Sequence, residues 1–214
     1  MKLQRVAAAF AVAAGLIVGT AAFADEPADR GMDSMMHGVQ MGRFGGPVYN
    51  GAPALAVTAS LVAAGGGAAK YSTATALTSM LGAATVKAEV GKLTKQYGAA
   101  AVDQWLKTFD FAVNDSLKIA TAAGVKLPEP TLSGKDLAAT LVKAGTTSDG
   151  TFQIEFLLDK AVSHKIHVQV MNDIDNADGL GKKADYDYHR MSNQAFYDVA
   201  QALGMTSVKL AAVH

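Results

Sequence analysis

The spacing of apolar residues along the chain is that of amphipathic helices. From Pro53 onward, apolar side chains recur every three or four positions, which places them on one face of a helix. The segment 102–120 shows this most clearly, because its apolar stripe keeps the 3.6-residue period of an α-helix. Alternating apolar and polar runs, which are typical of half-buried strands, are scarce. The sequence therefore predicts an all-α fold.

Glycines divide this pattern into about six or seven helices within a single-domain helical bundle. Several glycines directly follow apolar segments, as is common at helix C-termini, namely Gly82, Gly98, Gly124, Gly145 and Gly204. The longest segment, 151–175, is apolar nearly all round its helical wheel. A helix of that kind is usually buried at the centre of its bundle, so we expect one long central helix here. A polar loop over 176–183 then leads to a last helix over 185–203.

The first 24 residues have the order of a secretory signal peptide. Lys2 and Arg5 precede an apolar run over 6–18, which is shorter than the ~20 apolar residues of a membrane-spanning helix. Small residues at Ala22 and Ala24 then fit a signal peptidase. We predict a signal peptide over 1–24, cleaved after Ala24, and a mature protein located in the periplasm or secreted.

Residues 25–52 differ in composition from the rest of the mature chain. They are rich in glycine and methionine and contain few core-forming side chains at any period. Such a segment buries too little apolar area to offset the entropy of ordering it. The sequence therefore predicts a flexible leader over 25–52, followed by a helical domain over 53–214.

Charge and cysteine content exclude several classes of function. Without Lys2 and Arg5 the mature chain has 17 basic and 19 acidic residues, a formal charge of −2. This near-neutral balance gives no electrostatic reason to bind nucleic acid, and no later apolar run is long enough for membrane insertion after signal cleavage. The absence of cysteine excludes thiol catalysis, c-type haem attachment and thiolate metal sites.

The segment 151–175 also carries the first set of candidate metal ligands. On one continuous helix, His164, His167, Met171 and Asp175 fall within an arc of about 80°, stacked on successive turns. His189 would approach them if the last two helices pack antiparallel. Imidazole, thioether and carboxylate groups form a plausible ligand set for copper, another transition metal or haem. The alternative is that these histidines are partly buried and hydrogen-bond to backbone or carboxylate groups.

The leader holds a second candidate set. Five soft or borderline metal donors lie within ten residues of one another: Met32, Met35, Met36, His37 and Met41. Thioether sulfur selects Cu(I), and imidazole adds capacity for Cu(II). The alternative is a linker that happens to be rich in methionine.

Other searches for catalytic chemistry are negative. The sequence has no G-x-S-x-G, H-E-x-x-H or phosphate-binding glycine loop, and the acidic residues at 173–178 do not fit the EF-hand spacing. Glu155 and Asp159 lie one turn apart on a helix edge, where a pair of carboxylates usually faces water.

Two functional hypotheses remain. The first is an exported, non-enzymatic helical protein that binds a protein partner or a ligand as an accessory factor. The alternative is a periplasmic protein that binds a copper-type metal or haem through Met and His ligands, with the leader as a capture arm. An enzyme is the least favoured class, because no nucleophile, base or cofactor cradle is identified.

Overall fold

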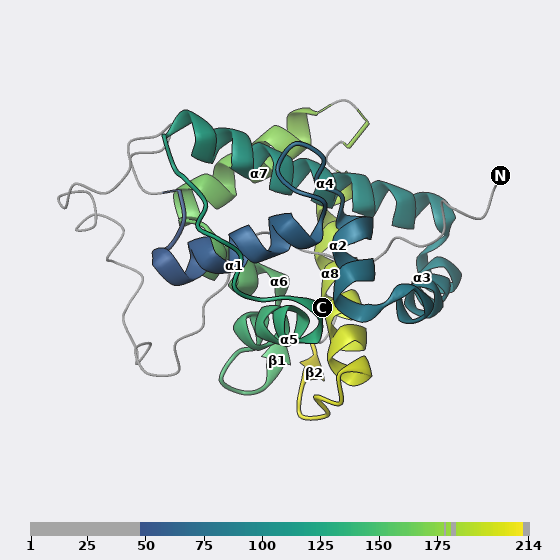
Figure 1. Ribbon diagram of the computed structural model, residues 1–214. Helices are drawn as coiled ribbons and strands as arrows, with labels where there is room; N and C mark the ends of the chain where they lie inside the picture. The colour runs from purple at the N-terminus through teal and green to yellow at the C-terminus, as the bar shows by residue number, and fades with distance from the viewer. Residues whose placement is uncertain (1–47, 178, 181–182, 212–214) are drawn as a thin grey trace.

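The computed structural model describes residues 48–177, 179–180 and 183–211 of the chain (Figure 1). The predicted signal peptide and the Met/His set at 32–41 lie outside these residues. The described part is helical, with eight helices: α1 (Ala52–Ala64), α2 (Thr73–Leu81), α3 (Ala83–Tyr97), α4 (Ala99–Ala122), α5 (Gly134–Gly145), α6 (Ile154–Ala161), α7 (His164–Asn176) and α8 (Lys183–Ala202). The prediction of an all-α, single-domain bundle is confirmed.

Two very short strands add to the helices. β1 (Thr151–Phe152) and β2 (Lys209–Leu210) pair in parallel, with Thr151 opposite Lys209. Because β1 directly precedes α6 and β2 follows α8, this pairing holds the chain after the last helix against the segment that enters α6 (Figure 1).

Helix α4 is the longest element and organises the bundle. It packs against α3, α7 and α8, and it crosses the top of the view in Figure 1 while α8 descends towards β2. Phe109 of α4 lies between two aromatic rings, those of Trp105 and Tyr188, at centroid distances of 5.0 and 4.6 Å. The indole nitrogen of Trp105 donates a hydrogen bond to Ser192 of α8 at 3.0 Å. This buried polar contact fixes the register of α8 on α4.

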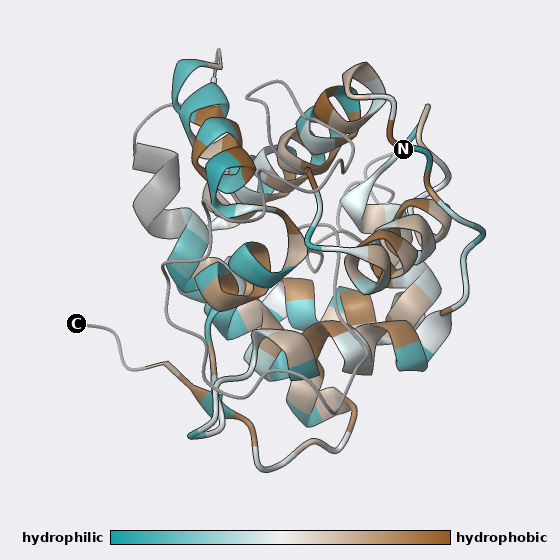
Figure 2. Cartoon of the chain, turned by 90° about the vertical axis from the view of Figure 1, so that its left-hand side faces the viewer, coloured by the Kyte–Doolittle hydropathy of each residue, from teal (hydrophilic) through white to brown (hydrophobic). Residues whose placement is uncertain are grey.

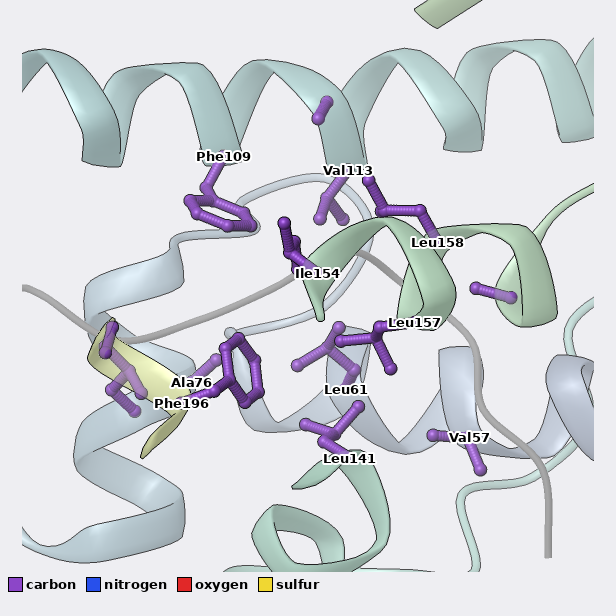
Figure 3. Packing of buried hydrophobic residues seen from close by; sticks show 14 of the residues in the cluster. Val57, Leu61, Ala76, Phe109, Val113, Leu141, Ile154, Leu157, Leu158 and Phe196 are labelled. Carbon is purple, nitrogen blue, oxygen red and sulfur yellow. The ribbon is translucent and has the colours of Figure 1, made fainter. Parts of the chain in front are cut away.

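The short helix α6 lies inside the bundle. Leu157 is completely buried and lies towards Leu61 of α1 and Leu141 of α5, whereas Ile154 and Leu158 lie towards α4 (Figure 3). Hydrophobic and hydrophilic bands alternate along the individual helices, as amphipathic packing requires (Figure 2). The core therefore holds α6 from both sides.

The prediction of one long helix over 151–175 is wrong. The chain forms two helices, α6 and α7, which are separated at Val162 and Ser163 by extended backbone with ψ values of 161° and 145°. This break raises the number of helices from the expected six or seven to eight. The physical reason is that the apolar residues of this segment belong to two shorter helices. Each helix has its own apolar face, and each buries that face separately.

The break is covered by an N-terminal strap, which we define as residues Val48–Asn50. Val48 and Tyr49 are 1% and 5% exposed, so the packed domain includes residues that the sequence pattern assigned to the leader. Tyr49 forms an antiparallel bridge with Val162, and the amide of Ser163 donates to the carbonyl of Val48 at 3.0 Å. The amide of Asn50 donates to the carbonyl of Ala161 at 3.3 Å. The strap therefore supplies hydrogen-bond partners for backbone groups that lack one where α6 ends.

Two helical glycines offer a matched test of the packing. A Cβ at Gly145 would lie 2.3 Å from the ring of Phe152, which is itself fully buried and stacked on Phe196 with centroids 4.5 Å apart. A Cβ at Gly91, within α3, meets nothing within 4 Å. We expect Gly145→Ala to lower the free energy of unfolding by about 1–3 kcal/mol through overpacking. Gly91→Ala should raise it by up to about 1 kcal/mol, the ordinary gain of alanine in a helix.

Urea unfolding followed by circular dichroism measures both changes. Equal effects of the two substitutions would contradict the tight packing of Phe152 against α5.

Candidate metal site

Three metal-ligating side chains converge where α6 ends and α7 begins. Asp159 lies on the last turn of α6, and His164 and His167 lie on the first turn of α7. One ligand atom from each lies within 4.8 Å of the others. Within the part of the chain that the structure describes, this is the group of three or more His, Asp or Glu residues whose spacing would suit a metal ion. We call these three residues the corner cluster.

The contacts in the corner cluster centre on one carboxylate oxygen. Nδ1 of His167 lies 2.9 Å from Oδ1 of Asp159, and Nδ1 of His164 lies 3.3 Å from the same atom. The side chain of His167 is 13% exposed, whereas those of Asp159 and His164 are 47% and 78% exposed. The cluster thus has one ligand set into the protein and two at the surface, and an ion can reach it from solvent.

The carboxylate of Asp159 is held in its charged form. Its hydrogen bond with His167 lowers the pKa of Asp159 below the usual value. Burial opposes this effect, and the contact with His164 lowers the pKa further. A carboxylate ionised at neutral pH supplies the negative oxygen that a metal cation requires.

Lys160, the residue after Asp159, is directed towards a neighbouring ring. Nζ of Lys160 lies 3.7 Å from the centre of the Phe156 ring, a cation–π contact on α6 itself. Partial burial lowers the pKa of Lys160.

The break in the helix creates the cluster. On one continuous helix, Asp159 and His164 would point about 140° apart, since five residues turn the helix through about 500°. The extended residues Val162 and Ser163 redirect α7, so that the two histidines return towards α6. The sequence pattern groups Asp159 with the water-facing carboxylates and does not indicate its approach to the two histidines. Ser163, a residue type that favours the N-cap, is the local signal that could have indicated a helix start at His164.

The other predicted ligands lie elsewhere. Met171 and His167 both line a small surface pocket, beside Leu158 and Tyr188. Asp175 is half-buried near the end of α7. Nδ1 of His189 lies 3.7 Å from Oε1 of Glu155, one turn before Asp159 on α6. The structure thus brings His164 and His167 together with Asp159, and it pairs His189 with a different carboxylate.

A second group of charged side chains lies between α3 and α8. Glu89 is only 7% exposed, and Lys92 donates a hydrogen bond to its Oε1 at 2.7 Å. Asp198 of α8 is half-buried, and Gln194 donates to it at 3.0 Å. Burial raises the pKa of Asp198, and the nearby charge of Glu89 raises it further. Ionised Asp198 is therefore a cost to folding at neutral pH.

We expect Asp198→Asn to stabilise the protein at pH 7. A carboxyl group whose pKa is raised in the folded state contributes stability below its unfolded pKa, and this contribution is lost as the pH rises through the folded pKa. The side chain of the new asparagine keeps an oxygen that accepts the hydrogen bond from Gln194, and it carries no negative charge. The free energy of unfolding should rise by about 0.5 kcal/mol at pH 7, since the group is half exposed, and should be unchanged at pH 3.

Urea unfolding of both proteins at the two pH values measures this difference. A gain of equal size at pH 3, or a loss at pH 7, would show that the charge of Asp198 is not a cost to folding.

None of the helices in the described residues is both long and apolar enough to cross a membrane. Comparisons with protein-family models, with curated proteins and with solved structures give no match.

Proposed function

We propose that this chain is an exported, non-enzymatic binding protein that holds one divalent transition-metal ion at Asp159, His164 and His167. The observation that carries the proposal is the convergence of one ligand atom from each of these residues within 4.8 Å. Ligand–metal bonds of about 2.0–2.2 Å place three ligands of one ion at most about 4.4 Å apart. The side chains of Asp159 and His164 are exposed, so they are the ones that would rotate to reach that geometry.

The donor set selects the class of metal. Two imidazole nitrogens and one carboxylate oxygen suit Zn²⁺, Cu²⁺ or Ni²⁺, whereas Cu⁺ prefers sulfur ligands. Three protein ligands also leave at least one coordination position for water or for a ligand from a partner. If copper is the metal, this donor set therefore favours Cu²⁺ over Cu⁺ at the corner cluster.

The same geometry favours an ion over a haem that is held by both histidines. The two axial ligands of a haem iron approach from opposite faces of a flat ring. His164 and His167 come from one turn of one helix and approach Asp159 from the same element. Such a pair can chelate a small ion but cannot stand on both faces of a macrocycle.

The exposure of the cluster supports binding rather than catalysis. His164 is 78% exposed, so the open coordination positions of a bound ion face water. Metal catalysis generally depends on a shaped cavity that excludes bulk water, whereas capture and release of an ion benefit from access.

Calorimetric titration of the metal-free full chain with Zn²⁺ and Cu²⁺ tests this proposal. We expect one ion per chain for the wild type. His167→Ala and Asp159→Asn should each weaken binding by at least tenfold, because each removes one of three ligands. His189→Ala is the matched control, since this histidine contacts Glu155, and it should leave the affinity unchanged.

Thermal unfolding provides a second measurement. A ligand that binds only the folded state stabilises it by about 2.7 kcal/mol at a hundred times its dissociation constant. Metal should therefore raise the melting temperature of the wild type and of His189→Ala by the same amount, and raise that of His167→Ala by clearly less. A wild type that binds no metal, or a site that survives both ligand substitutions, would refute the proposal.

A further inference from the structure

The backbone around the break can satisfy its hydrogen bonds in two exclusive ways. In a continuous helix the amide of Ser163 would donate to the carbonyl of Asp159, four residues earlier. In the structure the N-terminal strap forms the hydrogen bonds of this amide and this carbonyl instead. Ser163 donates to the carbonyl of Val48, and the carbonyl of Asp159 accepts a hydrogen bond from the side chain of Asn50.

Asn50 makes further contacts of the same kind. Its side-chain amide also donates to the carbonyl of Val162 at 2.9 Å, and its backbone amide donates to the carbonyl of Ala161. A continuous helix would use these two carbonyls for the amides of Ile166 and Lys165. One residue thus occupies three carbonyls that rejoining α6 and α7 would require.

The two arrangements differ in the corner cluster. With the strap docked, Asp159 lies 3.3 and 2.9 Å from His164 and His167. With the helix continuous, the side chains of Asp159 and His164 would point about 140° apart and could not hold one ion. The metal-binding arrangement is therefore the one in which the strap is docked.

We infer that Asn50 is a positioning residue for the metal site, and that docking of the N-terminal strap and metal binding at the corner cluster are coupled. The inference rests on the proposed function for its metal. Because coupling between two binding events is reciprocal, metal strengthens docking of the strap as much as the strap strengthens metal binding.

The first test is the affinity of the full chain for Zn²⁺ after Asn50→Ala. We expect a loss of about tenfold, the lower end of what is lost when a group that orients metal ligands is removed. The control is Asn176→Ala. This exposed asparagine of α7 donates at 2.7 Å to the carbonyl of Asn172 in its own helix, so the affinity of this variant should equal that of the wild type. Equal affinity of Asn50→Ala and the wild type would overturn the inference.

Asn50→Asp is a second variant, and circular dichroism must first show that it and Asn50→Ala remain helical; if neither folds, the exchange experiment on the wild type below tests the inference. Asn50→Asp keeps the shape of the side chain and the backbone contacts of the strap but replaces both amide donors by acceptors. Its added negative charge would by itself attract the cation, so a loss of Zn²⁺ affinity must come from lost positioning. A gain in affinity would overturn the inference.

Hydrogen exchange at the amide of Ser163 separates this inference from the proposed function. Without metal, exchange should be at least tenfold faster in Asn50→Ala than in Asn176→Ala. In the wild type, Zn²⁺ should slow it. A wild type that binds no Zn²⁺ refutes the proposed function, whereas a wild type that binds Zn²⁺ without slowing exchange at Ser163 refutes the coupling alone.

Discussion

The structure depends on how the backbone groups at residues 159–163 find hydrogen-bond partners. Buried amides and carbonyls that lose a helical partner must gain another one, or the helix continues. Here the strap supplies the replacements, from residues more than a hundred positions earlier in the chain. The helix break, the direction of α7 and the corner cluster all result from this single exchange of partners.

The break also resolves a packing problem. A segment that is apolar nearly all round cannot bury its whole circumference against neighbours if it remains one straight rod near the surface. Because the chain divides into two helices, α6 buries Ile154 and Leu157 in the centre of the bundle. Helix α7 buries Ile166 and Ile174, and it packs mainly against α4. The polar residues left at the junction face one another at the surface, held on two helices that the core fixes. Ligands on such rigid elements are the ones that keep a metal geometry.

Much of the fold could be predicted because its signals are local. The 3.6-residue period marks α4, and glycines mark the ends of helices such as α2 and α3. The break at Val162 could not be predicted in the same way, since no glycine or proline stands there and its partners come from Val48 and Asn50. The candidate site was found in part: the spacing of His164 and His167 indicated them, whereas Asp159 was missed because its approach exists only after the break. The signal peptide, the leader and its methionines remain predictions from the sequence.

The exchange of hydrogen-bond partners can be observed directly. A nuclear magnetic resonance experiment that detects couplings across hydrogen bonds correlates an amide nitrogen with the carbonyl carbon of its acceptor. Applied to the folded, metal-free chain, it should correlate the amide nitrogen of Ser163 with the carbonyl carbon of Val48, whose oxygen it contacts at 3.0 Å. A correlation of Ser163 with Asp159 instead would mean that the helix is continuous, and it would contradict both the strap and the corner cluster built on it.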